Sequence, residues 1–361
     1  MKRGGYVALI VLGVLFRAYI FAHLPRDLSV CATDYSVFYA GGKLAGSSSL
    51  YHRNATLTLL DQTIGCHASW AVFVKPPFYA AFMWPLAQLT FEQALLIWRM
   101  LGILALAAFV WLWPGNKYAA AASFAWCLPV STNFTVGQDV AFLLFFLLAG
   151  YRLIERRSPY AAGLILGLCA IKFHLFLLLP VLLLQKRLWR VAAGLATTGT
   201  ALTALSFVVA GRHWMIDYIA ALKNQGPYYD SGGFDYPNLR CLFHGYSLAF
   251  FCAAAAVVLL AFLLIRFGSL ATGFAAVIMG GLLLTPHSTL ADYTLLVPVL
   301  LLAVGSGLSA CRYLALFLMT PLVSVVAGSS SIWTLLLFVL LNMFAYQVTV
   351  LGENHAAYSP A

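Results

Sequence analysis

Apolar residues form runs of about 20 that recur along the whole chain, with short polar segments between them. A helix of that length crosses the hydrocarbon core of a bilayer. The pattern therefore predicts an all-α polytopic membrane protein with about 10 to 12 transmembrane helices, including a broken or re-entrant pair. We expect residues 1–361 to form a single integral membrane domain.

The second half of the chain has the most regular pattern. It predicts helices at about residues 191–210, 247–264, 270–284, 290–304, 314–327 and 332–350. This arrangement places five basic residues on one side of the membrane: Lys186, Arg187, Arg190, Arg266 and Arg312. The positive-inside rule makes that side cytoplasmic. The loop over 211–246 and the turn Thr285-Pro286-His287-Ser288 then lie on the outer side.

The N-terminus resembles a secretory signal, because Met1-Lys2-Arg3 precedes an apolar stretch over 6–22. No convincing small-residue cleavage site follows it. We therefore expect an uncleaved signal anchor with its N-terminus in the cytoplasm. Residues 24–75 would then form the first extracytoplasmic loop.

Two apolar segments depart from the regular pattern. Residues 78–89, between Pro77 and the region of Pro85, are too few to span a bilayer. Residues 161–184 are long enough, but Lys172-Phe173-His174 interrupts them and basic residues flank both ends. Two half-length helices meeting at Lys172 would keep both ends cytoplasmic and direct a cation into an outward-facing cavity. The alternative is one tilted helix with Lys172 extended toward the interface.

Composition supports the membrane assignment. Apolar residues make up 63% of the chain and charged residues 9%, and the mean hydropathy is +0.90. A water-soluble domain of this length needs a far more charged exterior. The net charge of +10 comes from short clusters beside the apolar segments, which favours anionic lipid headgroups or a phosphate-bearing lipid substrate over nucleic acid.

Asp34 is the first candidate for chemistry. It follows the first apolar segment, in a chain with 11 acidic residues. A carboxylate beside the membrane in so apolar a chain is a candidate general base.

Other polar residues fall on the same predicted side as Asp34. They are Lys75 before Pro76-Pro77, Gln138 and Asp139 after Gly137, Lys172 and His174 at the broken helix, Asn238 and Arg240 in the second loop, and His287. Together they supply one base, several cations and amide donors. This set suits transfer of a group from a phosphate leaving group, because cations offset the charge that grows on the phosphate.

Several of these residues also have plain structural explanations. Lys75 could be an interfacial anchor, and Asp139 a first-turn carboxylate stabilised by the helix dipole. Asp292 could orient His287 or cap the next helix. Tyr35 and Tyr39 could stack on a sugar or belong to the interfacial aromatic belt.

The seven cysteines form no metal-binding pattern. Cys31 and Cys66 share the first loop and could pair if it faces an oxidising compartment. We expect no cofactor, but a divalent metal is not excluded, because one loop acid and scattered histidines do not define a metal site.

Short motifs in a fixed order resemble glycosyltransferase family 87. They are Asp34, Phe38 and Tyr39 after the first helix, Gly46 with Leu50-Tyr51, Lys75-Pro76-Pro77, Gly137-Gln138, Ala162-Gly163 and Gly167 before Lys172, Asn238-Leu239-Arg240, and Pro286-His287. The family contains GT-C type membrane enzymes similar to polyprenyl-phosphomannose-dependent α-mannosyltransferases of bacterial envelopes. The resemblance implies a multi-pass protein of the bacterial inner membrane with an extracytoplasmic active site.

The resemblance also implies roles for individual residues. Asp34 corresponds to the presumed base, and His287 to a loop histidine near it. We expect the donor phosphate to meet Lys75, Lys172, His174 and Arg240, and the substrates to meet Tyr35, Tyr39, Gln138 and Asn238. Two positions depart from the family pattern: Lys172 is followed by Phe173 rather than proline, and Asp139 stands where asparagine is more usual.

The predicted function is transfer of a hexose, with mannose as the first candidate, from a polyprenyl-phosphate sugar to a lipid or glycan acceptor. Asp34 would deprotonate the acceptor hydroxyl, and the anomeric carbon would be inverted. A secondary transporter or lipid flippase remains an alternative, because broken helices with Lys and His at the midplane also occur there. A noncatalytic assembly subunit would instead place Asp34 and His287 far apart or toward lipid.

Overall fold

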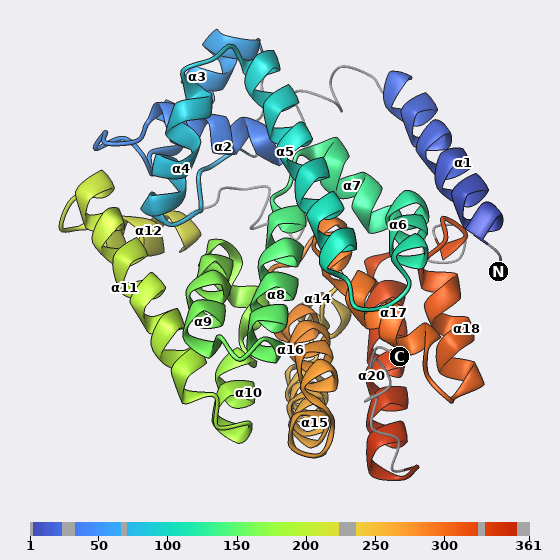
Figure 1. The fold of residues 1–361 in the computed structure, drawn as a ribbon. Coiled ribbons are helices and arrows are strands. Elements are labelled where there is room, and N and C mark those ends of the chain that lie inside the picture. Colours follow the sequence, from blue (N-terminus) through green and yellow to red (C-terminus); the bar gives the residue numbers. More distant parts are fainter. Residues whose placement is uncertain (1–2, 24–32, 66–70, 224–235, 324–328, 352–361) are drawn as a thin grey trace.

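The protein is described by a computed structural model that covers residues 3–23, 33–65, 71–223, 236–323 and 329–351. All regular elements in these ranges are helices, which confirms the predicted all-α class (Figure 1). Six helical segments are long and apolar enough to cross a membrane: residues 3–22, 91–112, 159–176, 189–210, 247–267 and 330–349. Three apolar helical segments of 10–17 residues accompany them. The predicted total of about 10 to 12 transmembrane helices stays a prediction.

Three short helices cover one end of the bundle. They are α2 (Asp34–Lys43), α3 (Arg53–Ile64) and α4 (Pro77–Ala87), at the upper edge of Figure 1. Helix α4 has 11 residues and so rises only roughly 16 Å, too little to span a bilayer, as predicted. Helix α4 packs on α2, where Gly42 lies close to the backbone of Met83.

Helices α5 (Phe91–Leu112) and α8 (Val140–Glu155) pack side by side below this cap. Between them the chain returns through α6 (Lys117–Trp126) and α7 (Leu128–Val136), which are separated by a break at Cys127. The hydrophobic pattern did not predict this break. Its cause is Pro129, because proline has no N–H for the carbonyl four residues earlier, that of Ala125.

Helix α1 (Arg3–Ala22) packs against α6 and supplies donors to the carbonyl groups left free at the break. Arg17 donates from Nε to the Ala125 carbonyl at 2.6 Å and from its guanidinium to the Cys127 carbonyl at 2.7 Å. Gly13 lies directly against Ala125, so α1 and α6 approach closely. The rest of α1 is largely exposed, as expected for a helix that faces lipid.

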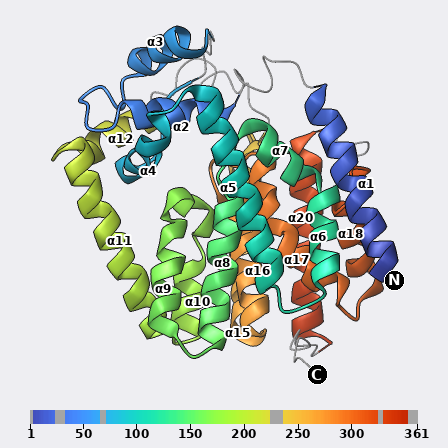
Figure 2. The same ribbon diagram turned by 45° about the horizontal axis from the view of Figure 1, so that its top comes forward.

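The predicted interruption at Lys172 is confirmed. Helix α9 (Pro159–Gly167) passes into a 3₁₀ segment, η2 (Leu168–Phe176), in which Lys172 has non-helical angles of φ −136° and ψ 56°. The chain continues as α10 (Leu179–Gln185). Residues 159–176 have the length of a membrane span, but Figure 2 shows α9 rising from the lower edge of the bundle and α10 returning to it. The segment is therefore a re-entrant helical hairpin with Lys172 near its apex.

Helix α11 (Trp189–Ala210) supports the hairpin from one side. It crosses α9 at very short distance, because a Cβ added at Gly163 would lie 2.0 Å from the Val191 carbonyl oxygen. Helix α12 (Trp214–Lys223) then lies within the predicted second loop, and α14 (Leu239–Leu242) follows near its end.

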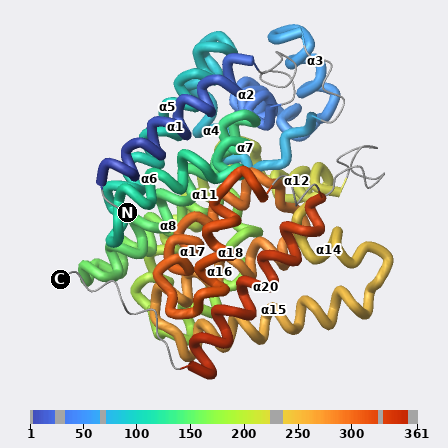
Figure 3. Tube along the Cα trace, turned by 90° about the vertical axis from the view of Figure 1, so that its right-hand side faces the viewer, coloured from blue at the N-terminus to red at the C-terminus, as the bar shows by residue number. Residues whose placement is uncertain are grey.

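The C-terminal helices complete the bundle. They are α15 (Ser247–Phe267), α16 (Leu270–Leu284), η3 (Leu290–Leu296) continuing into α17 (Val297–Val304), α18 (Ser309–Leu318) and α20 (Ser330–Thr349). Helix α20 packs along α15 and α16 (Figure 3). The predicted bounds agree closely with the structure except for 314–327, where the helix begins earlier, at Ser309, and ends at Leu318. Residues 324–327 of that prediction lie outside the described residues.

Candidate active site

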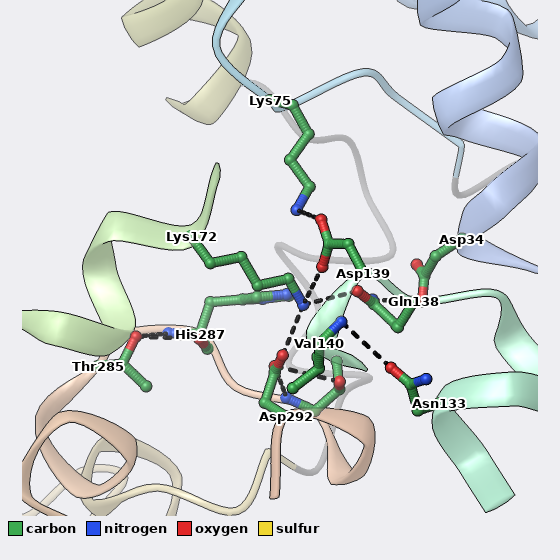
Figure 4. Close-up of polar contacts among 11 residues, drawn as sticks. Asp34, Lys75, Asn133, Gln138, Asp139, Val140, Lys172, Thr285, His287 and Asp292 are labelled. Carbon is green, nitrogen blue, oxygen red and sulfur yellow. Dashed lines mark hydrogen bonds and ion pairs between the residues drawn. The ribbon is translucent and has the colours of Figure 1, made fainter. Parts of the chain in front are cut away.

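Five separate segments meet at the end of the bundle that carries α2. They are the start of α2, the non-helical segment that carries Lys75 before α4, the turn between α7 and α8, the apex of η2, and the segment from Thr285 to η3. Figure 4 shows the side chains of Asp34, Lys75, Lys172 and Asp292 directed toward the turn that contains Gln138 and Asp139. The chain therefore concentrates most of its predicted site in one polar cluster.

Asp34 is the first residue of α2 and is half-buried. Its Oδ2 accepts a hydrogen bond of 2.7 Å from the side-chain amide of Gln138. Its Oδ1 has no partner among the described residues. Burial raises the pKa of Asp34, and the Lys172 charge and the Gln138 hydrogen bond act against that rise. One carboxylate oxygen is thus held by the protein, while the other can accept a proton.

Lys172 is the most enclosed cation of the cluster, with 5% of its side chain exposed. Its ammonium lies 2.5 Å from Oδ1 of Asp292, 2.6 Å from Oε1 of Gln138 and 3.3 Å from Oδ1 of Asp139. A buried ammonium requires such partners, because an unpaired charge in this environment is costly. The non-helical backbone at Lys172 places it at the apex, where it reaches all three.

Lys75 forms the second ion pair, 2.7 Å from Oδ2 of the fully buried Asp139. Its ammonium also lies 5.0 Å from the Phe38 ring centre and 5.1 Å from that of Tyr79, which adds cation–π attraction. Burial lowers the pKa of Lys75, and the adjacent Asp139 carboxylate opposes that effect. Asp139 therefore supplies the charged partner that a largely enclosed ammonium requires.

The turn that carries Gln138 and Asp139 has a defined local cause. Helix α7 ends at Gly137 with φ of +67°, a left-handed conformation that glycine adopts readily. A Cβ at Gly137 would also lie 2.6 Å from the Cβ of Tyr35. Asn133 fixes the turn by accepting bonds from the backbone N–H groups of Gln138 and Val140.

The sequence offered Asp292 two roles, orienting His287 or capping the next helix; the structure confirms the cap and adds an ion pair that was not predicted. Asp292 caps η3 through the backbone N–H of Thr289 at 2.8 Å and also pairs with Lys172. It does both because its two oxygens face different partners. The available signal was a carboxylate inside an apolar segment, which must find a cation if it is buried.

His287 and His174 form the edge of the cluster. Their rings lie 6.4 Å apart, and the Tyr236 ring lies 4.6 Å from that of His287. Burial lowers the pKa of His287 to about 4, so its imidazole is neutral near pH 7. The buried Nε2 of His174 has no hydrogen-bond partner among the described residues.

The remaining predicted residues lie outside the ion network. Arg240 is exposed on α14, and Asn238 is buried and caps that helix by accepting from the Cys241 N–H at 3.0 Å. Tyr35 is fully buried among aromatic rings, and Tyr39 is 2% exposed and donates to the Leu89 carbonyl. Both tyrosine rings are covered, so neither presents a free face to a sugar in this conformation.

The described residues contain no group of three or more His, Cys, Asp and Glu side chains arranged to hold a metal. Instead, lysines neutralise the buried carboxylates Asp139 and Asp292. Cys31 and Cys66 lie outside the described residues, so their pairing stays a prediction.

A cavity of about 180 Å³ lies elsewhere, toward the opposite end of α5, α8, α16 and α17. Its lining is mostly apolar, with Phe109, Trp113 and Phe274 among its walls. It does not contain the ion network, and the chemistry is better located by the converging charges than by cavity size.

The comparison with known families supplies the remaining observation. A family model described as glycosyltransferase family 87 matches residues 73–291, more than half of the chain. The chain belongs to glycosyltransferase family 87. It is therefore a membrane glycosyltransferase, which confirms the resemblance. No curated protein and no solved structure matches the chain.

The family 87 match includes Lys75, Gln138, Asp139, Lys172 and His287, but it begins after Asp34 and ends one residue before Asp292. The structure joins both outer residues to the matched region through Gln138 and Lys172. Their place in the cluster thus rests on geometry rather than on the family match.

Proposed function

We propose that this family 87 member transfers a hexose, with mannose as the first candidate, from a polyprenyl-phosphate donor to a lipid or glycan acceptor. Asp34 acts as the general base, and the configuration at the anomeric carbon is inverted. The observation that carries this proposal is the Asp34 carboxylate, which is held at one oxygen and has no described partner at the other.

The proposed step is a single in-line displacement. The acceptor oxygen forms a bond to the anomeric carbon while the bond from that carbon to the phosphate oxygen breaks. Asp34 takes the acceptor proton, and the polyprenyl phosphate leaves with the bonding electron pair. A raised pKa suits Asp34 to this task, because a stronger base accepts the proton more readily once it is ionised.

The donor phosphate is proposed to bind on the Lys75 side of the cluster. Lys75 is the more exposed lysine, with 12% of its side chain accessible against 5% for Lys172, and it has fewer protein partners. Neutral His287 and the buried Nε2 of His174, which has no hydrogen-bond partner among the described residues, supply further polar groups. Arg240 would have to move toward the cluster to take part.

We propose that lysine charge, rather than a bound cofactor, stabilises the leaving phosphate. The chemistry of the side chains supports this, because each described carboxylate of the cluster already faces an N–H donor. The proposed location is the bacterial inner membrane, with a cytoplasmic N-terminus and an extracytoplasmic site. Basic residues near the other helix ends, including Arg156, Arg187 and Arg266, support this orientation.

Asp34→Asn tests the proposal. We expect transfer by the purified protein in liposomes to fall roughly 10² to 10⁴-fold, because asparagine cannot accept the proton. The assay uses polyprenyl-phosphate mannose as donor and extracted membrane lipids as acceptor. Asp61→Asn, on the exposed face of α3, is the matched control and should keep wild-type turnover.

Two results would contradict the proposal. Near wild-type turnover in Asp34→Asn would remove Asp34 as the base. No transfer by the wild-type protein from polyprenyl-phosphate mannose, with transfer from a nucleotide sugar, would instead remove the proposed donor class.

A further inference from the structure

Gln138 connects the candidate base to the buried lysine. Its amide nitrogen donates to Oδ2 of Asp34 at 2.7 Å, and its Oε1 accepts from the Lys172 ammonium at 2.6 Å. The side chain is 8% exposed, so these two contacts dominate its surroundings (Figure 4). Neither contact follows from its predicted role as a substrate ligand.

The chemistry of the two partners fixes which way the amide points. A lysine ammonium has donors and no acceptor, and an ionised carboxylate has acceptors and no donor. The amide oxygen must therefore face Lys172, and the amide N–H₂ must face Asp34. A reversed amide would lose both hydrogen bonds and create two repulsive contacts.

Lys172 is itself immobilised. Asp292 of η3 and Asp139, the neighbour of Gln138, hold its ammonium at 2.5 Å and 3.3 Å. The non-helical backbone at the hairpin apex directs it inward. The orientation of the Gln138 amide is consequently determined by residues from η2, η3 and the turn before α8.

We propose that Gln138 is a positioning residue, which acts through Asp34: anchored by Lys172, its amide holds Oδ2 and leaves Oδ1 directed to the acceptor hydroxyl. This inference rests on the proposed role of Asp34 as the base. Gln138 transfers no proton and forms no covalent bond. Its contribution is to keep the carboxylate in one rotamer and to stabilise its ionised form.

The effect of Gln138 on the ionisation of Asp34 has a definite sign. The charged groups that act on Asp34 are Lys172 and Lys75, which favour the carboxylate, and Asp292, which disfavours it. Burial raises the pKa of Asp34, and the hydrogen bond from Gln138 lowers it. Removing that N–H must raise the pKa further, so a higher pH is needed to ionise the base.

Gln138→Met tests this inference, because methionine has a similar length but cannot donate a hydrogen bond. We expect kcat to fall roughly 10 to 100-fold, with KM for polyprenyl-phosphate mannose changed by less than about threefold. The acidic limb of the kcat/KM profile should move roughly one to two units toward higher pH, since a hydrogen bond to a charged group is lost. Gln88→Met, on an exposed residue that bonds to its own helix, should leave the profile unchanged.

Gln138→Glu provides a second variant if methionine disturbs folding. Glutamate keeps an acceptor for Lys172 but loses the donor to Asp34 and adds a negative charge beside it. The acidic limb should then move at least as far as in Gln138→Met. Thermal unfolding of both purified variants separates loss of fold from loss of positioning.

Two outcomes would overturn the inference while leaving the role of Asp34 intact. If Asp34→Asn is inactive but Gln138→Met raises KM with an unchanged acidic limb, Gln138 binds substrate rather than positions the base. If folded Gln138→Met and Gln138→Glu keep wild-type kcat and pH profile, the contact has no catalytic effect. Activity in Asp34→Asn would instead indicate failure of the proposed function itself.

Discussion

The two buried lysines differ in how tightly the protein holds them. Lys172 has three oxygen partners from two segments, the turn before α8 and η3, whereas Lys75 has Asp139 and two aromatic faces. If the donor phosphate replaces one protein partner of a lysine, fewer contacts are therefore lost at Lys75 than at Lys172. Asp139 can keep its second ion pair, with Lys172, while that exchange occurs.

Lys75→Met should weaken binding of the polyprenyl-phosphate donor. We expect kcat/KM for polyprenyl-phosphate mannose to fall roughly 10 to 100-fold, chiefly through KM, because a charge-assisted contact to phosphate is lost. Steady-state kinetics over a range of donor concentrations measure the change. Lys43→Met, on the exposed end of α2, is the matched control. An unchanged KM in folded Lys75→Met would remove Lys75 from the phosphate site.

Individual site residues were predictable where the sequence made them conspicuous. Asp34, Lys75 and Lys172 stand out as charges in apolar surroundings, and the structure brings them together. The partners of these charges were not predictable. Lys172, for example, pairs with Asp292, which lies 120 positions away in the sequence. Aromatic residues carried less information, since Tyr35 has the same local sequence context whether it stacks on sugar or fills the core.

The re-entrant hairpin depends on close backbone contact with α16. A Cβ at Gly281 would lie 1.8 Å from the Leu175 carbonyl oxygen of η2, a distance that no small adjustment relieves. Glycine at this position lets η2 rest against α16, and so sets the depth of Lys172. The hairpin is thus located by packing as well as by its ion pairs.

Gly281→Ala should displace the hairpin. We expect a loss of roughly 1 to 3 kcal/mol of stability from overpacking, together with lower activity as Lys172 shifts from Gln138. Thermal unfolding and transfer rate measure the two effects. Gly199→Ala on α11 is the matched control, because its added Cβ meets nothing within 4 Å and alanine favours the helix. Equal behaviour of the two variants would contradict this account of the hairpin.

At the level of elements, the sequence predicted one break and missed another. The break at Lys172 was visible because polar residues interrupt an apolar run that basic residues flank on both sides. The break between α6 and α7 was not, since no charged residue marks it and proline is tolerated in membrane helices. Recognising it required Arg17, which lies 108 positions from its acceptor at Ala125.

The whole molecule has two chemically different ends. The ion network, α2 and α3 lie at one end, while the turn after α8 and the junction of α10 and α11 carry basic residues at the other. This separation is what the positive-inside rule predicts for an outward-facing site. The bounds of the second-half helices followed from hydropathy, and the side of the membrane that each end faces stays a prediction.

Cysteine labelling tests the proposed orientation. Asp61→Cys on α3 should react with a membrane-impermeant maleimide in intact spheroplasts, whereas Arg156→Cys in the turn after α8 should react only after permeabilisation. The parent chain, with its seven cysteines, gives the background. The reverse labelling pattern would place the site on the cytoplasmic side.

The pairing of Lys172 with Asp292 also orders events during biosynthesis. A ribosome reaches codon 292 long after the hairpin has left the exit tunnel, so for that interval the ammonium lacks its closest counterion. Until then the nascent hairpin is costly to seat in lipid. A chain truncated before Asp292 would therefore leave Asp139, at 3.3 Å, as the remaining ion-pair partner of Lys172.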